Sequence, residues 1–196
     1  MTGAVRWIGF AGALVVLGPT LQAAGEMVAG VSDAGDGYNG FPVIEIWKGE
    51  RRMELRRGTV LLREFHVALG EQPRYGKELQ GDGRTPVGRY FVSEKHPDSR
   101  FHRFLGISYP NVEDAERGYR RGLIDAGQWA DIFFANLRGD APPWHTVLGG
   151  RVGIHGYGGR PYLPVDWTEG CVAVSNDDIE FVYDRAPLGT PVIINE

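Results

Sequence analysis

The chain has 196 residues, of which 42% are hydrophobic and 23% are charged, an ordinary globular composition that supports one core. Its formal net charge of -4 and its pI near 5.8 exclude the basic surface with which proteins bind nucleic-acid phosphates. We therefore expect no nucleic-acid partner. Glycine is frequent, at 29 residues, which favours a β-rich chain with many tight turns over a helix bundle.

The first 24 residues have the pattern of a secretory signal peptide. A basic residue precedes an apolar run from Trp7 to Leu17, and small residues follow at Ala23 and Ala24. The run is shorter than the about 20 apolar residues that a spanning helix needs, so we expect cleavage, with an uncleaved anchor as the alternative. The pattern predicts a signal peptide over residues 1–24, export to the periplasm or cell wall, and a polar connector over residues 25–40.

Beyond the connector, short apolar and alternating runs separated by Gly and Pro predict β-strands in one domain over residues 41–196. The stretch from Asn111 to Leu137 instead places apolar residues at helical spacing, with a break at Gly118, and predicts a helical insertion. Residues 175–182 predict a second short helix, with Ser175 or Asn176 as its N-cap. The fold class is therefore mainly β, with a helical insertion at about residues 111–137. The predicted strands are residues 43–47, 53–57, 59–62, 64–68, 89–93, 104–108, 151–155 and 191–195.

Two segments concentrate the residues that can do chemistry, Gly153–Tyr157 and Thr168–Asn176. Cys171 is the single cysteine, and a lone thiol in an exported protein is either a buried apolar residue or a reactive group. A thiolate is a nucleophile, and the imidazole of His155 can take the thiol proton. Gly170 would let backbone N–H groups turn towards a substrate carbonyl as an oxyanion hole. A buried cysteine beside a core histidine is the alternative from spacing alone.

These segments resemble the signature of the YkuD-type L,D-transpeptidase domain, in which a His-Gly pair on a strand is followed by a Ser/Thr-x-Gly-Cys segment. Residues 81–90 are similar to the family's Gly-Asp-x-x-Thr-Pro-x-Gly-x-Tyr segment. Residues 101–110 are similar to a stretch found in one exported subgroup. The likeness covers residues 41–196 and implies a β-sandwich-like L,D-transpeptidase catalytic domain with its helical insertion near the cleft.

The resemblance implies acyl transfer on peptidoglycan stem peptides. Cys171 would attack the carbonyl before the terminal D-alanine and form a thioester, with His155 as general base and then acid. The backbone carbonyl of Gly156 would orient the imidazole. An amine of a second stem would then form a cross-link, or an amine of a lipoprotein would accept the acyl group. With water as acceptor the chain would be an L,D-carboxypeptidase or peptidase, and a binding module with an inert thiol is a further alternative.

Two departures from the family pattern bear on substrate recognition. Glu169 stands where many members have His, and Ala173 stands where many have Arg. The missing cation leaves the recognition of a substrate carboxylate to Arg151, Arg160 or Arg84.

Candidate substrate-binding residues also include aromatic side chains near the motif, since these suit packing against a peptide or sugar, although core packing explains them equally well. No cofactor is expected, and no metal, because the few His residues and the single Cys lack the close pair spacings of zinc ligands. The predicted substrate-binding residues are Gly170, Thr168, Tyr157, Arg151 and Trp167.

Overall fold

The computed structural model describes residues 40–161 and 165–196. The predicted signal peptide lies outside the described residues, as does the connector apart from Gly40. None of the helices in the described ranges is long and apolar enough to cross a membrane. The described residues belong to one compact unit, a curled sheet with three helices, which confirms the predicted mainly β fold class.

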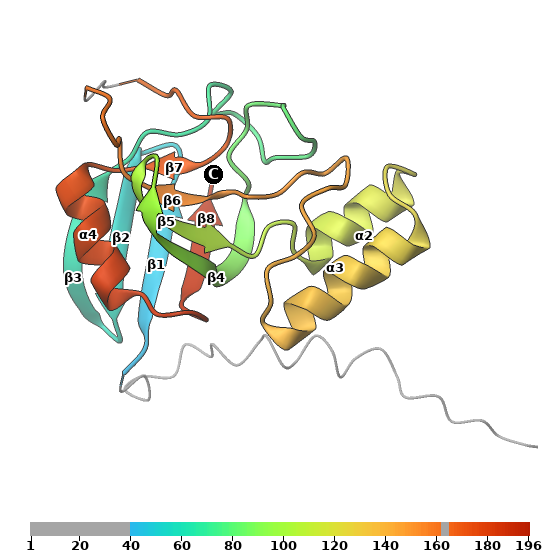
Figure 1. The fold of residues 1–196 in the computed structure, drawn as a ribbon, viewed down its shortest axis with the longest axis horizontal. Coiled ribbons are helices and arrows are strands. Elements are labelled where there is room, and N and C mark those ends of the chain that lie inside the picture. Colours follow the sequence, from blue (N-terminus) through green and yellow to red (C-terminus); the bar gives the residue numbers. More distant parts are fainter. Residues whose placement is uncertain (1–39, 162–164) are drawn as a thin grey trace, which may run out of the picture. The chain divides into compact units, whose positions relative to one another are not determined.

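Eight strands form one sheet in the order β3-β2-β1-β8-β4-β5-β6-β7 (Figure 1). Neighbouring strands are antiparallel, except that β1 pairs with β8 and β6 pairs with β7 in parallel. Along β1, Ile44 and Ile46 are buried and Glu45 is not, the alternation of a strand with one covered face. The strands are β1 Pro42–Trp47, β2 Arg52–Arg57, β3 Val60–His66, β4 Gly88–Ser99, β5 His102–Ile107, β6 Gly153–His155, β7 Val172–Ala173 and β8 Pro191–Asn195.

The sheet curls because β4 takes part in two halves of it. Residues 88–91 of β4 pair with β8, and the remainder, from Val92, pairs with β5 with two register irregularities, which increase local bending. At the other edge the chain leaving β3 meets β7, where Ala68 and Ala173 exchange two backbone hydrogen bonds of 2.8 Å. The main apolar core draws buried side chains from all eight strands.

The predicted helical insertion is two helices rather than one. Helix α2 spans Val112–Arg120 and α3 spans Ala126–Arg138. The caps explain the division: Asn111 and Asp125 each begin a helix with a reciprocal capping box, and Gly122 takes a positive φ of 68° between them. The two helices pack around a small apolar cluster of their own and lie to one side of the sheet (Figure 1).

Helix α4, Asn176–Arg185, directly follows the segment that contains Cys171. Ser175 is its N-cap and accepts a hydrogen bond from the backbone N–H of Asp178. Ile179 and Val182 are fully buried in the main core, so the helix is held against β5 and β6. The end of the Cys171 segment is therefore attached to a well-packed element.

The segment predicted as two strands, residues 59–62 and 64–68, is the single strand β3. Most of its side chains are exposed apart from Phe65, because β3 lies at the edge of the sheet. The last predicted residues, Val67 and Ala68, leave β3 and run towards β7. Because the chain turns away from β3 here, the loop that follows lies next to the Cys171 segment.

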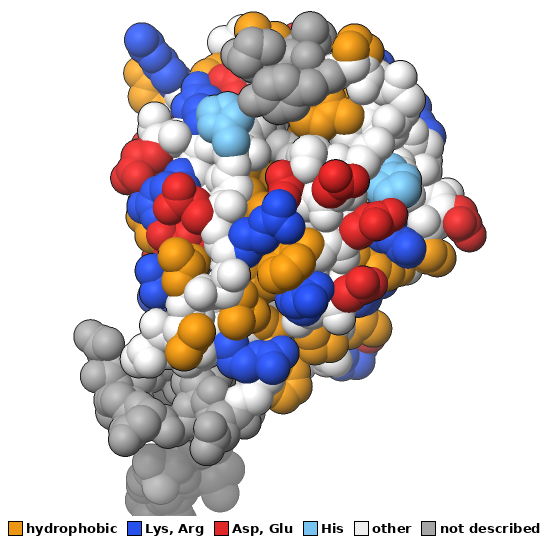
Figure 2. Space-filling view, turned by 90° about the vertical axis from the view of Figure 1, so that its left-hand side faces the viewer, with side chains coloured by type: hydrophobic (Ala, Val, Ile, Leu, Met, Phe, Trp, Pro, Cys, Tyr) orange, Lys and Arg blue, Asp and Glu red, His pale blue; other side chains and the backbone are white. Residues whose placement is uncertain are grey.

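The face that carries β3 and α4 shows acidic and basic side chains intermingled (Figure 2). Arg63 of β3 pairs with Asp178 of α4 at 2.7 Å. Arg52 of β2 lies close to several carboxylates, with Glu50 at 2.8 Å. On this face the charges therefore neutralise one another locally.

Candidate active site

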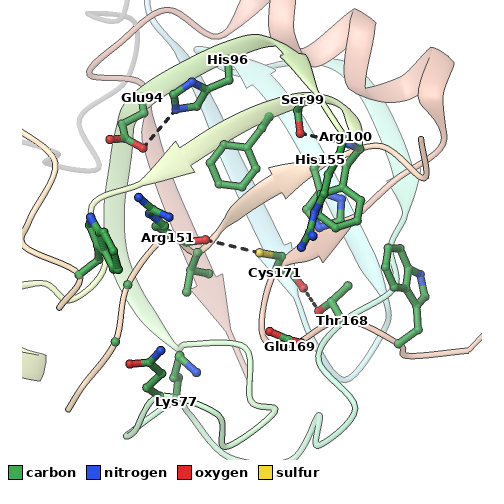
Figure 3. Close-up of a pocket in the computed structure, with 18 of the residues that line it drawn as sticks. Lys77, Glu94, His96, Ser99, Arg100, Arg151, His155, Thr168, Glu169 and Cys171 are labelled. Carbon is green, nitrogen blue, oxygen red and sulfur yellow. Dashed lines mark hydrogen bonds and ion pairs between the residues drawn. The ribbon is translucent and has the colours of Figure 1, made fainter. Parts of the chain in front are cut away.

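A pocket of about 760 Å³ opens where β5, β6 and the segment before β7 meet, and both Cys171 and His155 line it (Figure 3). Its wall is completed by the turn between β4 and β5, by the residues leading into β6, and by Lys77 from the loop between β3 and β4. Four separate parts of the chain thus converge on one thiol and one imidazole.

The strand register places the thiol and the imidazole on the same face of the sheet. His155 of β6 is paired with Ala173 of β7, and Cys171 lies two residues before Ala173. Because side chains two residues apart in an extended chain project to the same side, Cys171 and His155 become diagonal neighbours. Fifteen residues separate His155 from Cys171 in the sequence, and they lie in the connection between β6 and β7.

The His155 ring is fixed in one tautomer. Its Nδ1 lies 2.7 Å from the carbonyl oxygen of Gly156, and since a carbonyl only accepts, Nδ1 carries the proton. Nε2 is therefore left as the acceptor that can take a thiol proton.

Aromatic side chains enclose the His155 imidazole. Phe101 stacks on it with ring centroids 4.3 Å apart and planes 18° apart. Trp167 meets it edge-on at 5.7 Å. His155 is consequently only 1% exposed, and this burial lowers the pKa of His155 to about 4.

Burial also dominates the state of the thiol and raises the pKa of Cys171 to about 11. A hydrogen bond with the Gly153 backbone and the positive charge of Lys77 act in the opposite direction. At neutral pH the resting pair is therefore a thiol beside a neutral imidazole. Proton transfer from the thiol to the imidazole creates a thiolate and an imidazolium together. The free energy of this step therefore depends on the charged and polar groups around the thiol.

The turn before Cys171 is held by Thr168. Its hydroxyl donates to the Cys171 carbonyl at 2.7 Å and accepts from the Gly170 N–H at 3.1 Å. Gly170 has φ 133°, and a Cβ at this position would lie 2.6 Å from the carbonyl oxygen of Arg84. The Gly170 N–H is thus used within the turn, so an oxyanion hole here needs other backbone N–H groups.

Residues 42–194 match the YkuD family, described as the L,D-transpeptidase catalytic domain. The chain belongs to this family. A curated relative from Escherichia coli (strain K12), named "Putative L,D-transpeptidase YafK", is 34% identical over 87 residues, which are 41% of this chain and 35% of that protein. The match thus spans about a third of the relative's length.

Solved structures share the fold of this L,D-transpeptidase domain. The helical cell shape determining protein Pgp2 from Campylobacter jejuni aligns with a TM-score of 0.56 at 20% identity, over 88% of this chain and 55% of that one. Bd1075 from Bdellovibrio bacteriovorus aligns with a TM-score of 0.50 at 21% identity, over 79% of this chain and 48% of that one. At such identities the likeness concerns the fold.

The arginines considered for anion recognition lie in different places in this L,D-transpeptidase domain. Arg151 lines the pocket, stacks its guanidinium over Trp144 at 3.7 Å, and has its carbonyl 3.8 Å from the Cys171 sulfur. Arg160 lines the pocket beside Trp167. Arg84 does not line it and lies over Tyr75 instead.

The two aromatic residues predicted to bind substrate differ in position. Trp167 lines the pocket, whereas Tyr157 does not, is 5% exposed and packs with Ala68 and Ala173. Tyr157 therefore lies in an apolar cluster next to Trp167, and its part in substrate binding stays a prediction. Sequence reasoning could not separate these positions, since both residues are aromatic and close to the motif.

Sequence reasoning assigned no role to several residues that shape the pocket. Phe101 was noted only within a matched segment, and neither Arg100 nor Lys77 carries a local pattern that marks it as part of a site. Lys77 is distant in sequence from Cys171, and only the path of the loop after β3 brings it near. Within the described ranges, no three His, Cys, Asp or Glu side chains group as a metal site.

Proposed function

We propose that this chain is an exported, cysteine-dependent L,D-transpeptidase that acts on peptidoglycan stem peptides through a thioester acyl-enzyme. The observation that carries the proposal is the pairing of Cys171 and His155 in one pocket, with Nδ1 of His155 bound to the Gly156 carbonyl. This arrangement leaves an imidazole acceptor on the same face as a thiol, which nucleophilic catalysis requires.

In the acylation step, the Cys171 proton passes to Nε2 of His155 and the sulfur bonds to the carbonyl carbon before the terminal D-alanine. Backbone N–H groups near Cys171 stabilise the negative oxygen of the tetrahedral intermediate. The carbon–nitrogen bond then breaks, and His155 returns the proton to the departing amine. D-alanine leaves, and the stem remains attached to Cys171 as a thioester.

In the second step an amine attacks the thioester. His155 takes a proton from the amine, a new amide bond forms, the carbon–sulfur bond breaks, and His155 returns the proton to the sulfur to restore the thiol. A side-chain amine of a second stem gives a cross-link, and an amine of a lipoprotein gives an attachment to the wall. Water in the same position gives hydrolysis, so the acceptor decides between cross-linking and trimming.

We assign substrate positioning to those predicted substrate-binding residues that line the pocket. Arg151 offers a guanidinium at the rim, and such a group recognises a carboxylate well. Trp167 offers a flat surface beside His155. Thr168 acts through the shape of the Cys171 turn, because its hydroxyl is already bound to the backbone.

The acceptor is tested by incubating purified protein with a disaccharide-tetrapeptide and analysing the products by mass spectrometry. The proposal predicts a cross-linked dimer and free D-alanine, with neither in the Cys171→Ala protein. Tripeptide without any dimer, even with excess amine acceptor, would instead identify an L,D-carboxypeptidase.

Export is tested separately, by fractionating cells that produce the full chain. The signal peptide proposed for residues 1–24 predicts recovery of a shortened protein in the periplasmic or wall fraction. A full-length chain found in the cytosol would contradict this part of the proposal.

A further inference from the structure

Lys77 is a buried cation in the wall of the Cys171 pocket. Its side chain is 4% exposed, yet it lines the same pocket as the thiol (Figure 3). Lysine is among the residues least often buried without a partner. Its position therefore needs an explanation.

The Lys77 ammonium is held by the loop between β3 and β4. Nζ donates to the carbonyl of Leu79 at 3.0 Å and to Asp82 at 2.8 Å. Asp82 in turn accepts backbone N–H bonds from Glu78, Leu79 and Arg84. The loop is thus closed around the carboxylate, which fixes the position of the cation.

The fixed ammonium lies against the residue before the thiol. A Cβ built on Gly170 would be 3.5 Å from Nζ of Lys77. The Asp82 carboxylate binds the same ammonium within its own loop. The positive end of this ion pair is thus the end that lies against the Cys171 turn. Such a fixed charge at a partly desolvated site acts more strongly than a mobile surface charge.

Charged groups reach the Cys171 thiol from several elements. Lys77 and the exposed Arg100, from the turn between β4 and β5, lower the thiol pKa, whereas the exposed Glu169 raises it. His155 faces it from β6, and Arg151 and Arg160 line the rim of the pocket. Ala173, the position where many family members have Arg, is fully buried. Among these pocket cations only Lys77 is buried.

We propose that Lys77 is a positioning residue that stabilises the Cys171 thiolate during proton transfer to His155. The inference rests on the proposed function, in which Cys171 is the nucleophile. When the proton moves from sulfur to Nε2, a thiolate and an imidazolium form, and Lys77 offsets the negative charge without forming or breaking a bond. It thereby compensates for Glu169 and for the absence of a cation at Ala173.

The test uses alkylation of the full chain, because Cys171 is its single cysteine and alkylation needs no cell-wall substrate. Neutral iodoacetamide reports the thiolate fraction, and its rate is measured from about pH 6 to pH 10, below the raised pKa of Cys171, where the rate is proportional to that fraction. Anionic iodoacetate is run in parallel. Lys77→Gln is the main variant, because glutamine keeps a donor for Asp82 and Leu79 while losing the charge.

For Lys77→Gln we expect the rate with iodoacetamide to fall about tenfold at each pH in this range, which displaces the profile by about one pH unit. Iodoacetate should slow by a similar factor. Lys77→Arg should retain most of the wild-type rate. Glu169→Gln should raise the rate, and Arg138→Gln, which removes an exposed cation on α3, should leave the rate unchanged.

An unchanged iodoacetamide rate in folded Lys77→Gln would overturn the inference, and so would a Lys77→Arg protein as slow as Lys77→Gln. Slowing of iodoacetate alone would also overturn it, because Lys77 would then bind an anion rather than stabilise the thiolate. Folding is checked by thermal unfolding, and Lys77→Met replaces Lys77→Gln if the latter does not unfold cooperatively. If the muropeptide assay gives no product while alkylation depends on Lys77 as expected, only the proposed function is contradicted.

Discussion

At the scale of single residues, His155 is kept neutral by its surroundings. The ring lies between Phe101 and Trp167 and is almost completely buried. Water is thereby excluded from the imidazole, so its protonated form is costly until a thiolate forms beside it. The arrangement avoids a permanent thiolate, which would be readily oxidised if the protein is exported as proposed.

This burial predicts a pH dependence of stability. Burial lowers the pKa of His155 in the folded state from 6.5 to about 4, so the unfolded chain takes up this proton first as the pH falls. The contribution to stability is fully present above about pH 6.5 and is lost as the pH falls towards 4. We expect His155 to account for a decrease of about 3 kcal/mol in the free energy of unfolding over that range.

The measurement is denaturant unfolding at pH 7 and pH 4.5 for the wild-type protein and for His155→Gln. Other groups titrate in both proteins, so the difference between the two isolates His155. The variant should lose less stability on acidification than the wild type. Equal losses in the two proteins would show that His155 is not buried in its neutral form.

At the scale of elements, the turn from Thr168 to Cys171 determines where the thiol points. Gly170 has a positive φ, and a Cβ there would collide with the backbone of Arg84. Gly170→Ala should therefore displace the turn and reduce the rate of acylation by about 100-fold or more, since small misplacements of reacting groups are costly.

Gly159→Ala is the matched control, because Gly159 lies in the same connection and a Cβ there would meet nothing within 4 Å. Acylation is followed by mass spectrometry of the intact protein, with thermal unfolding as a check on folding. A Gly170→Ala protein that acylates as fast as Gly159→Ala would show that the turn does not constrain the thiol.

Elements with a clear periodicity were predictable from the sequence. Strands β1 and β8 were placed within one residue, because their apolar runs end at Gly, Pro or the chain end. The division between α2 and α3 was missed, because capping at Asp125 depends on a reciprocal bond with Gln128 that resembles an ordinary helical sequence. Strand β3 was divided in two because Arg63, an exposed residue on an edge strand, interrupts its apolar run.

Site residues that belong to a short sequence motif were predictable from the sequence. Site residues that reach the pocket from distant segments were not. Cys171, His155 and Gly156 lie in two short segments that a single sequence displays. Lys77 and Phe101 reach the pocket through a loop and a hairpin turn whose paths depend on the curl of the whole sheet. Neither periodicity nor turn chemistry contains that information.

At the scale of the whole molecule, the two edges of the sheet are joined beside the site. Asp166 pairs with Arg51 at 2.7 Å and accepts the backbone N–H of Leu69 at 2.9 Å. This contact fixes the segment before Thr168 to the chain that leaves β3. The same region contains the isolated bridges between Ala68 and Ala173 and between Gly70 and Thr168, so closure of the sheet and placement of the thiol are linked.

Asp166→Ala should therefore lower the free energy of unfolding by about 2 kcal/mol, because partly buried charged hydrogen bonds are lost. Asp140→Ala is the control, since Asp140 pairs with Arg138 on an exposed surface where such pairs contribute little. Denaturant unfolding of both variants measures the difference. Equal stability of the two would contradict the role given to Asp166 in joining the edges.

The measurement that tests the central claim most directly is mass spectrometry of the acyl-enzyme formed from a tetrapeptide stem. The wild-type protein should gain the mass of the stem without its terminal D-alanine, and Cys171→Ala should gain nothing. His155→Ala should acylate about 100- to 10,000-fold more slowly, the usual contribution of a general base. An adduct on Cys171→Ala, or a His155→Ala protein that acylates at the wild-type rate across the pH range, would contradict the account.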